Sequence, residues 1–424
     1  MLNKNNRIFA LGIFLMLALN VYAQNNTSSP YSMFGIGELS NESFGRSMAM
    51  GDVSSSLYSP FHLNPGNPAS YMALGPNSFV FEVGATAKYL MLETPTDKYK
   101  DFGANFSYLS IGFPVVKWWK SGIGLKPFSS IGYDIKQTAT IEFDDTEIVN
   151  TYYGEGGISS FYFDNSFKIL KTLSVGFKLS YLFGPLINSK MSTSANENSI
   201  AIIDEKDKAN ISSFSYKTGI HFHKNLSENV FLSIGATYGI ASDLKAEHQL
   251  LATNVVSRVN GYFIDTLKNE IAPTSVLQIP ESYSAGASVL LNRKFELAVD
   301  YSKSKWSESM YFGEDQLLSD QEKFAFGIEY MPDFMSISYL KTVRYRLGAN
   351  FAKSYLLYQG TQLNKYNVSF GMGLPIKRSA SIVNFAVSYG KRYIPGSDIL
   401  TEDYFQFQLN LSLQSIWFKK RVWQ

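Results

Sequence analysis

Residues 405–414 read FQFQLNLSLQ, an unbroken alternation of apolar and polar side chains. Successive side chains of a β-strand point to opposite faces, so this stretch has one face of Phe and Leu and another of Gln, Asn and Ser. Residues 173–183, LSVGFKLSYLF, repeat the pattern with Ser, Gly and Lys on the polar face. Strands of soluble sandwiches alternate too, but these runs reach the roughly 10 residues that a tilted strand needs to cross a bilayer. The pattern therefore favours strands that face lipid on one side.

The same alternation, followed along the chain, predicts 14 strands. Their ranges are 78–92, 103–115, 120–142, 147–168, 171–188, 210–224, 228–250, 278–291, 294–306, 322–331, 341–351, 365–374, 380–391 and 402–417. Most odd-numbered gaps between them are long, such as 189–209 and 251–277, and most even-numbered gaps are short. Long loops at one end, short turns at the other and an even strand number are typical of outer-membrane barrels. We therefore predict an all-β fold, a 14-stranded antiparallel transmembrane β-barrel over residues 78–418.

The composition excludes several other classes of protein. The 424 residues are 45% hydrophobic, 15% aromatic and only 17% charged. Lys and Arg number 38 against 36 Asp and Glu, so there is no basic field to attract a nucleic acid. The absence of Cys excludes disulfides, thiolate metal sites and Cys nucleophiles. We expect no cofactor and no metal.

The two ends of the chain suggest an exported protein. Lys4 and Arg7 precede an apolar run over residues 8–19, and Val21 and Ala23 then put small or tolerated residues at the −3 and −1 positions before Gln24. This arrangement predicts a signal peptide over residues 1–23, cleaved after Ala23. We expect the mature protein in the outer membrane of a Gram-negative cell, with residues 419–424 as a basic periplasmic tail.

The segment 24–77, which precedes the first predicted strand, differs from the rest of the chain. It holds 5 of the 14 Pro, 6 of the 31 Gly and 4 of the 12 Met. It is too apolar for a linker and too often interrupted for a regular domain. A barrel of 14 strands is too wide for its own side chains to fill, since about 8 strands already suffice for that. We expect this segment to be a luminal plug, or hatch, with Phe34, Phe44, Leu57 and Phe61 as candidates to line a ligand site; the alternative is a periplasmic extension that binds a partner.

The third predicted strand contains residues that interrupt strand pairing. Pro127 lies within an alternating run that also contains Gly122, Gly124 and Gly132. Pro removes a hydrogen-bond donor, and both residue types mark edges and bulges in sheets. Our hypothesis is that residues 122–132 form a kinked strand beside a lateral gate in the barrel wall. The alternative is a bulge without an opening.

Several motifs resemble a known family in their order and spacing. Residues 45–51 (GRSMAMG) and 67–70 (NPAS) resemble the plug region of the long-chain fatty acid and toluene outer-membrane transporter family. Residues 122–133, 280–306, 345–374 and 384–390 resemble strands of that family. The resemblance implies a 14-stranded barrel, an N-terminal hatch and passage of hydrophobic molecules sideways into the membrane. The hatch residues that it implies are Gly45, Arg46, Met48, Met50, Gly51, Asn67, Pro68 and Ala69. It also implies that Asn67, Pro68 and Ala69 hold the plug against the lateral opening.

The resemblance leaves two functions open. The opening SSPYSMFGIGEL (residues 28–39) suggests the Bacteroidota branch of the family. That branch also includes the barrel subunit of a secretion attachment complex, and fold does not settle function. Our first hypothesis is passive uptake of long-chain fatty acid-like molecules, with such a molecule and outer-membrane lipid as partners and no nucleic acid. The alternative is a barrel that scaffolds surface-protein secretion or attachment, with secretion-complex subunits as partners and no small-molecule transport.

The sequence gives little support for an enzyme. The four His residues, His62, His221, His223 and His248, lie in no recognisable catalytic motif. A barrel lipid hydrolase would need His221 or His223 hydrogen-bonded to a Ser, with a third group to orient the His. We therefore predict no catalytic residues. Arg46 in the plug needs a carboxylate partner, which is either a side chain of the wall or the carboxylate of a fatty acid.

Overall fold

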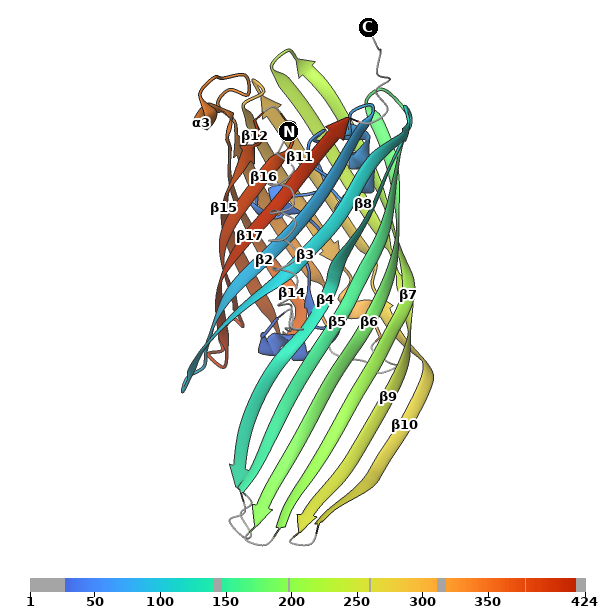
Figure 1. Ribbon diagram of the computed structural model, residues 1–424, viewed down its shortest axis with the longest axis vertical. Coiled ribbons are helices and arrows are strands. Elements are labelled where there is room, and N and C mark those ends of the chain that lie inside the picture. The colour runs from blue at the N-terminus through green and yellow to red at the C-terminus, as the bar shows by residue number, and fades with distance from the viewer. Residues whose placement is uncertain are drawn as a thin grey trace, which may run out of the picture.

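The computed structural model describes residues 27–140, 147–196, 199–258, 261–310, 318–377 and 379–416. Its antiparallel strands pair into a closed 14-strand barrel, which confirms the predicted fold class (Figure 1). The first barrel strand, β2 (Ser78–Glu93), closes the barrel by pairing with the last, β17 (Thr401–Ile416). The other strands are β3 (Lys98–Val116), β4 (Trp119–Thr140), β5 (Glu147–Lys168), β6 (Leu173–Asn196), β7 (Ser199–Ser227), β8 (Val230–Ile240), β9 (Ser242–Arg258), β10 (Gly261–Ile279), β11 (Ser282–Leu291), β12 (Phe295–Ser304), β13 (Gln321–Tyr330), β14 (Arg344–Tyr358), β15 (Thr361–Pro375) and β16 (Ile382–Tyr393). The predicted signal peptide and basic tail lie outside the described residues.

Two of the 14 wall positions are each shared by two successive strands. β8 continues as β9 after Ala241, and β10 continues as β11 after Pro280 and Glu281. β7 pairs with β8 near the short turns and with β9 farther along. β11 pairs with β8, and β10 pairs with β9. Each interrupted pair therefore occupies one position in the circle of strands.

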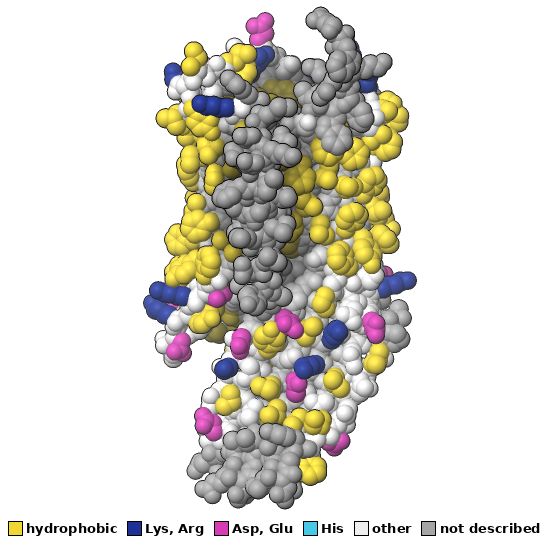
Figure 2. Space-filling model, viewed as in Figure 1, with side chains coloured by type: hydrophobic (Ala, Val, Ile, Leu, Met, Phe, Trp, Pro, Cys, Tyr) yellow, Lys and Arg dark blue, Asp and Glu magenta, His cyan; other side chains and the backbone are white. Residues whose placement is uncertain are grey.

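The outer surface of the barrel is apolar, as the alternation predicts. In β17, Phe407 is 47% exposed on the outside, whereas the next residue, Gln408, is 5% exposed and points into the lumen. Phe405 and Leu409 are exposed beside Phe407, and Asn410 is buried beside Gln408. Figure 2 shows hydrophobic side chains forming a broad band over the upper part of the barrel. A band of this kind around a closed barrel is suited to hydrocarbon. No helix among the described residues is long and apolar enough to cross a membrane.

Replacing Phe407 with Arg tests the lipid-facing surface. We expect the free energy of folding into lipid vesicles to become less favourable by about 2–4 kcal/mol, because a cation near the middle of the bilayer loses its hydration. Urea titration of the vesicle-inserted protein measures this change. Thr96→Arg, in an exposed turn, is the control and should have little effect. An equal change in the free energy of folding for Phe407→Arg and Thr96→Arg would argue that Phe407 does not face lipid.

The strands β4–β7, β9 and β10 continue beyond the other strands, at the end opposite the short turns (Figure 1). The prediction of long loops over 189–209 and 251–277 was therefore wrong, because β6, β7, β9 and β10 run through most of these ranges. These ranges carry charged residues such as Asp204 and Glu205 and lack a long apolar alternation. In this extension, exposed sheet faces meet water, so the strands can carry charge. We call this part the extended sheet.

An apolar core fills the lumen where the extended sheet begins. Tyr31 and Ile36 of the N-terminal segment pack there between the sheet and the opposite wall. The core also contains Ile131, Tyr133, Ile158, Leu182, Leu186, Ala209, Ile211, Leu244, Ala246, Leu277, Trp306, Tyr355, Leu356, Leu363 and Ile394. Close packing of these side chains joins the N-terminal segment to the wall at the end where the extended sheet begins.

Candidate functional site

Residues 27–77, which we call the N-terminal segment, lie within the ring of strands. They form η1 (Pro30–Met33), the two-residue strand β1 (Glu38–Leu39), the short helix α2 (Gly45–Met48) and η2 (Pro68–Ala73). Met50, Val53 and Asn67 are fully buried, although the segment contains little regular structure. Contacts with the wall therefore hold it in place, and these contacts occur in three regions.

The first region is the turn at Asn67. The Asn67 side chain accepts a hydrogen bond from the backbone N–H of Ala69 at 3.0 Å, which caps η2. Its amide group also donates to the carbonyl oxygens of Ser55 at 2.8 Å and Ile220 at 3.2 Å. Pro68 fixes the backbone at the first position of the helix. One Asn thus joins the turn to another part of the segment and to β7.

The wall is shaped to receive this turn. The hydroxyl groups of Ser166 and Ser174 both donate to the carbonyl oxygen of Ala69, at 2.8 and 3.0 Å. Gly176 and Gly219 leave space for the turn, since a Cβ at either would collide with it. The turn is therefore docked on β5, β6 and β7. The expectation that Asn67, Pro68 and Ala69 hold the plug against an opening at residues 122–132 was wrong.

The second region is α2, where Arg46 forms an ion pair with Glu296 of β12 and with Glu329 of β13, the latter at 3.1 Å. Glu329 also contacts Arg346 at 2.7 Å and Arg344 at 3.2 Å. Both acids are buried, so each needs cationic or hydrogen-bonding partners. Of the two roles considered for Arg46, the structure shows pairing with the wall.

The remaining hatch residues pack against neighbouring strands. Met50 lies in a small apolar cluster with Val53 and Leu57 of the segment and two Ala residues of β12 and β13. Gly51 has a φ of 68°, a conformation that favours Gly, and lies against the backbone of β13 and β14. The sulfur of Met48 accepts a hydrogen bond from Gln408 at 2.7 Å. Gly45 adjoins the side chain of Asn410.

The third region is a gap in the barrel wall between β3 and β4. These strands pair only from Leu109 with Leu125 to Val116 with Trp119. Beyond Leu125, β4 pairs with β5, with an irregularity between Pro127 and Ser129. Over residues 98–108, β3 pairs with β2 alone. The ladder of hydrogen bonds around the barrel is thus open at one place.

The N-terminal segment occupies the free edge of β4. Glu38 and Leu39 of β1 pair with Ser130 and Ser129 in antiparallel register. The backbone N–H of the following residue, Ser40, donates to a carbonyl of β4 at 2.9 Å. β1 therefore pairs with part of the β4 edge that β3 does not cover.

The four predicted gate residues have different positions. Pro127 lies at the irregularity, and the backbone of Gly132, on the part of β4 that β3 does not pair with, is hydrogen-bonded to the Ser32 hydroxyl. Gly122 and Gly124 lie in the paired part instead, where they make room for two Tyr rings. The small size of these two Gly residues therefore serves packing inside the barrel, and Gly124 lies one residue from the last pair between β3 and β4.

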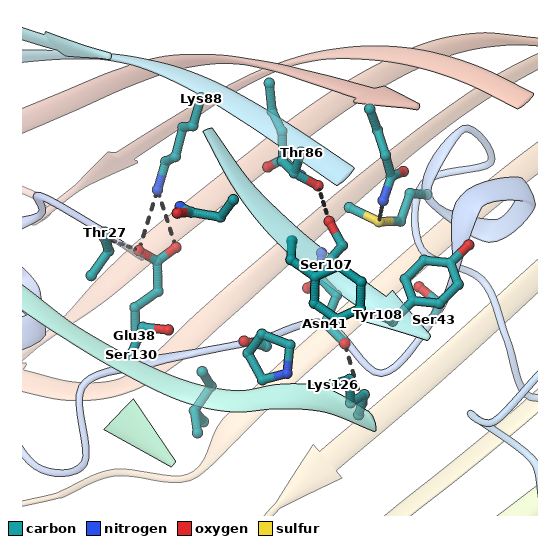
Figure 3. Close-up of a pocket in the computed structure, with 18 of the residues that line it drawn as sticks. Thr27, Glu38, Asn41, Ser43, Thr86, Lys88, Ser107, Tyr108, Lys126 and Ser130 are labelled. Carbon is teal, nitrogen blue, oxygen red and sulfur yellow. Dashed lines mark hydrogen bonds and ion pairs between the residues drawn. The ribbon is translucent and has the colours of Figure 1, made fainter. Parts of the chain in front are cut away.

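A cavity of about 150 Å³ lies inside the gap (Figure 3). Leu39, Phe44, Phe106 and Pro127 contribute apolar surface to it. Its polar lining comes from Glu38, Asn41, Lys88, Lys126, Lys365 and Arg392, among others. The cavity is therefore amphipathic, with cationic groups beside an opening in the wall.

Ion pairs hold the chain at β1 and just after it. Glu38 contacts Lys88 at 3.2 Å and also pairs with Arg392. Burial alone would raise the pKa of the Glu38 carboxyl, but Arg392 and Lys88 hold it well below its usual value. Partial desolvation would raise the pKa of the Glu42 carboxyl, which is 49% exposed, but its ion pair with Lys217 and other nearby cations lower it to about 2. Both carboxylates therefore stay charged and fix β1 at the gap.

The four ligand-lining candidates do not form one site. Phe44 lies at the gap cavity, where its ring stacks on Tyr108 with centroids 3.5 Å apart. Leu57 is buried in the apolar cluster with Met50. Phe61 lies toward the short-turn end, under the guanidinium of Arg344, and Phe34 is 42% exposed. The irregular segment places these four apolar residues against different parts of the wall, and of the four Phe44 lines the gap cavity.

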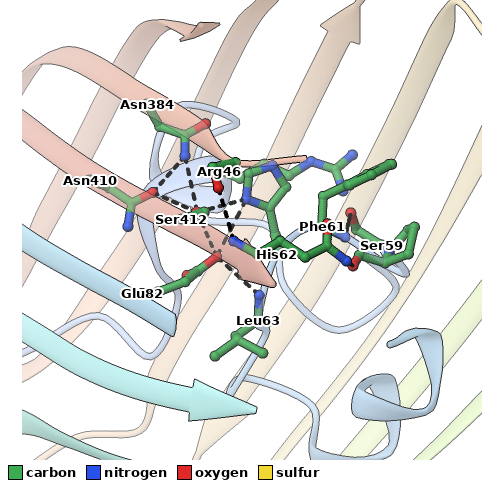
Figure 4. A network of polar contacts seen from close by, with 12 residues as sticks. Arg46, Ser59, Phe61, His62, Leu63, Glu82, Asn384, Asn410 and Ser412 are labelled. Atoms are coloured by element: carbon green, nitrogen blue, oxygen red, sulfur yellow. Dashed lines mark hydrogen bonds and ion pairs between the residues drawn. The ribbon is translucent and has the colours of Figure 1, made fainter. Parts of the chain in front are cut away.

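Two His residues do lie near Ser hydroxyls, but neither has the geometry of a catalytic site. The Nε2 of His221 is 3.0 Å from the Ser233 hydroxyl, and its Nδ1 has no hydrogen-bond partner within the described residues. His62 directs one nitrogen, Nδ1, at both Ser412 (3.3 Å) and Glu82 (3.5 Å), as Figure 4 shows. A catalytic triad uses the two ring nitrogens for two different partners. Burial and nearby Arg residues hold the pKa of His62 well below its usual value, so this ring stays neutral. No group of three or more His, Cys, Asp or Glu in the described part of the chain is placed to hold a metal ion.

Comparison with known proteins gives a family and a fold. No curated protein matches this sequence. The family model described as BamG matches residues 5–424. This chain belongs to the BamG family. That label differs from the transporter family named from the motifs, and nothing in the comparisons supports the Bacteroidota branch.

Solved structures similar to this BamG-family chain include toluene transporters and a monoaromatic hydrocarbon channel. The toluene transporter TodX of P. putida has a TM-score of 0.58 at 16% identity, covering 90% of this chain and 100% of its own. A FadL homologue of Pseudomonas aeruginosa has a TM-score of 0.58 at 11% identity, covering 89% and 99%. The CymD monoaromatic hydrocarbon channel has a TM-score of 0.52 at 14% identity, covering 90% and 99%. At these identities the likeness shows the fold alone.

Proposed function

We propose that this protein is an outer-membrane channel through which hydrophobic molecules of the long-chain fatty acid type diffuse passively and leave sideways into the bilayer. The observation that carries the proposal is the gap between β3 and β4, with an amphipathic cavity behind it. A hydrophobic molecule has a lower free energy in lipid than in water, so an opening in the wall that leads to lipid is a suitable exit. The apolar band on the outer surface and the channel fold of the structural neighbours are consistent with this.

The proposed route requires β1 to leave β4. The cavity of about 150 Å³ is smaller than the roughly 300 Å³ at which ligand pockets usually begin. β1 lies beside it and is held by the ion pairs of Glu38. A molecule with an acidic head group could compete for Lys88 and Arg392 and weaken these contacts. In this proposal the N-terminal segment is a plug, and β1 is its movable part.

A specific observation favours the second candidate, a scaffold for a surface-protein secretion or attachment complex. The apolar core that contains Tyr31 and Trp306 fills the lumen at the end where the extended sheet begins. The extended sheet next to it is an ordered surface beyond the wall. A closed lumen with a projecting sheet suits the binding of other proteins better than conduction. The two candidates differ in whether the lumen ever opens.

A disulfide between β1 and β4 separates the two candidates. The chain contains no Cys, so Leu39→Cys with Ser129→Cys introduces a single pair at directly opposed positions. For a channel, uptake of a labelled long-chain fatty acid by cells that produce this variant should fall to the level of cells lacking the protein. Reduction should restore uptake, because β1 is then free to leave.

The matched control places a disulfide between two strands that are already paired. Phe385→Cys with Leu409→Cys joins β16 to β17 on the outer face and should leave uptake unchanged in both redox states. Uptake that persists through the oxidised β1–β4 pair would exclude exit at this gap. No protein-dependent uptake in any variant, including the reduced ones, would exclude transport of this fatty acid and favour the scaffold.

A further inference from the structure

One connection at the short-turn end is longer than its neighbours and carries exposed apolar side chains. It is residues 331–343, between β13 and β14, which we call the rim loop; it includes the short helix α3 (Tyr339–Thr342). Ile337 is fully exposed, and Met335 and Leu340 are 80% and 69% exposed. Phe334 and Tyr339 are exposed as well. Loops in water rarely gather so many large apolar side chains without a surface to cover them.

The rim loop is ordered by its own contacts. The backbone N–H of Asp333 donates to the carbonyl of Lys341 at 2.9 Å, joining its two ends. The hydroxyl of Tyr339 donates to the carbonyl of Pro375 at 3.2 Å, which ties α3 to the end of β15. These hydrogen bonds fix the backbone of the rim loop, and its exposed apolar side chains therefore have defined positions.

The loop leans over the outer surface of the barrel. Tyr345 alternates with the buried Arg346, so its side chain is on the lipid-facing side of β14. The Tyr345 hydroxyl donates to the carbonyl of Leu340 at 3.1 Å, which places α3 above this outer face. Figure 1 shows α3 at the rim, outside the end of the barrel. Leu347, the next outward residue of β14, is 54% exposed and belongs to the apolar band.

Basic groups accompany the apolar ones. Lys341 is exposed in α3, and Lys377, in the neighbouring turn, lies 5.9 Å from the centre of the Tyr339 ring. The one acid of the loop, Asp333, accepts a hydrogen bond from the backbone of Met335 at 3.0 Å. Figure 2 shows Lys or Arg next to hydrophobic side chains at this end, directly beyond the apolar band. Aliphatic side chains with Tyr and Lys are the composition of segments that lie in the membrane interface.

We propose that the rim loop binds the surface of the phospholipid leaflet at the short-turn end. Met335, Ile337 and Leu340 enter the boundary between head groups and acyl chains, and Lys341 and Lys377 meet the phosphates of anionic lipids. A lipid surface fits better than a protein partner because the loop leans toward the side of the wall where lipid already lies. The loop anchors this rim of the barrel, independently of what passes through the lumen.

Fluorescence quenching by lipid tests this proposal on the full chain. Ile337→Cys gives a unique thiol for an environment-sensitive probe, because the protein has no other Cys. The labelled protein is inserted into vesicles of phosphatidylethanolamine and phosphatidylglycerol that contain lipids brominated on the acyl chain. We expect strong quenching by bromine and protection from aqueous iodide. Probes at Glu228→Cys, in an exposed turn at the same end, and at Thr96→Cys, at the other end, are the controls and should be open to iodide.

Lipid charge provides a second measurement. Replacing phosphatidylglycerol with phosphatidylcholine should reduce the quenching at position 337, and so should Lys341→Gln combined with Lys377→Gln. A probe at position 337 that iodide reaches and bromine does not would overturn the proposal. A probe shielded from both quenchers would overturn it too, because another part of a protein would then cover the loop.

Discussion

Replacing Arg46 with Met is expected to release α2 from the wall and to lower the free energy of unfolding by about 3–5 kcal/mol. Among the described residues, Arg46 is the one ion-pair partner of Glu296 and one of three partners of Glu329. The variant leaves Glu296 buried without a countercharge. A buried carboxylate without a partner is unstable, so the N-terminal segment or the nearby strands must rearrange to admit water or a proton.

Unfolding in urea, with the protein in lipid vesicles, measures this loss. Lys98→Met is the matched control, because Lys98 and Glu93 form an ion pair of similar length that is largely exposed. Its removal should change the free energy by about 0–1 kcal/mol. Arg46→Met combined with Glu296→Gln should recover part of the stability, since the double variant has no uncompensated charge at Glu296. If Arg46→Met and Lys98→Met had equal effects, the buried ion pair would not hold the segment.

The barrel strands could be predicted from the sequence because every second side chain of such a strand faces lipid and is therefore apolar. The alternation in 405–414 predicts β17, and the structure places Phe407 outside and Asn410 inside as expected. Alternation of apolar and polar residues did not identify the parts of β7 and β9 that lie in the extended sheet, where charged residues such as Glu205 occur. Outside lipid, polarity no longer distinguishes a strand from a loop, so those segments were predicted as loops.

The site was harder to predict because its contacts are long-range. Pro127 marked the irregularity in β4, but nothing local indicates that Leu39, about 90 residues earlier, takes the free edge. A signal for the docked turn was present in the sequence. Gly176 and Gly219 lie on the lumen face of their strands, and Gly within a strand often marks the close approach of another backbone. Two successive strands with such a Gly could have indicated the docking surface of the Asn67 turn.

Replacing Gly176 with Val is expected to push the Asn67 turn off the wall. A Cβ at this position would lie within 3.0 Å of the backbone nitrogen of Ala69 and the carbonyl carbon of Pro68. Both contacts are with backbone atoms of a capped helix, which cannot change rotamer to make room. The hydrogen bonds from Ser166 and Ser174 to Ala69 would then be lost as well. We expect a loss of about 3 kcal/mol in the free energy of unfolding, at the upper end of the usual cost of overpacking.

Gly103→Val separates crowding from the general cost of replacing Gly in a strand. In β3, the nearest atom to a Cβ at Gly103 is the side-chain nitrogen of Asn105, 4.0 Å away, so Val fits there without displacing anything. Val also favours strands more than Gly does, so this control should be neutral or slightly stabilising. Limited proteolysis then reports on the turn itself: cleavage near Ala69 should become faster in Gly176→Val and stay slow in Gly103→Val. Destabilisation without faster cleavage would place the strain in β6 and not in the docking of the turn.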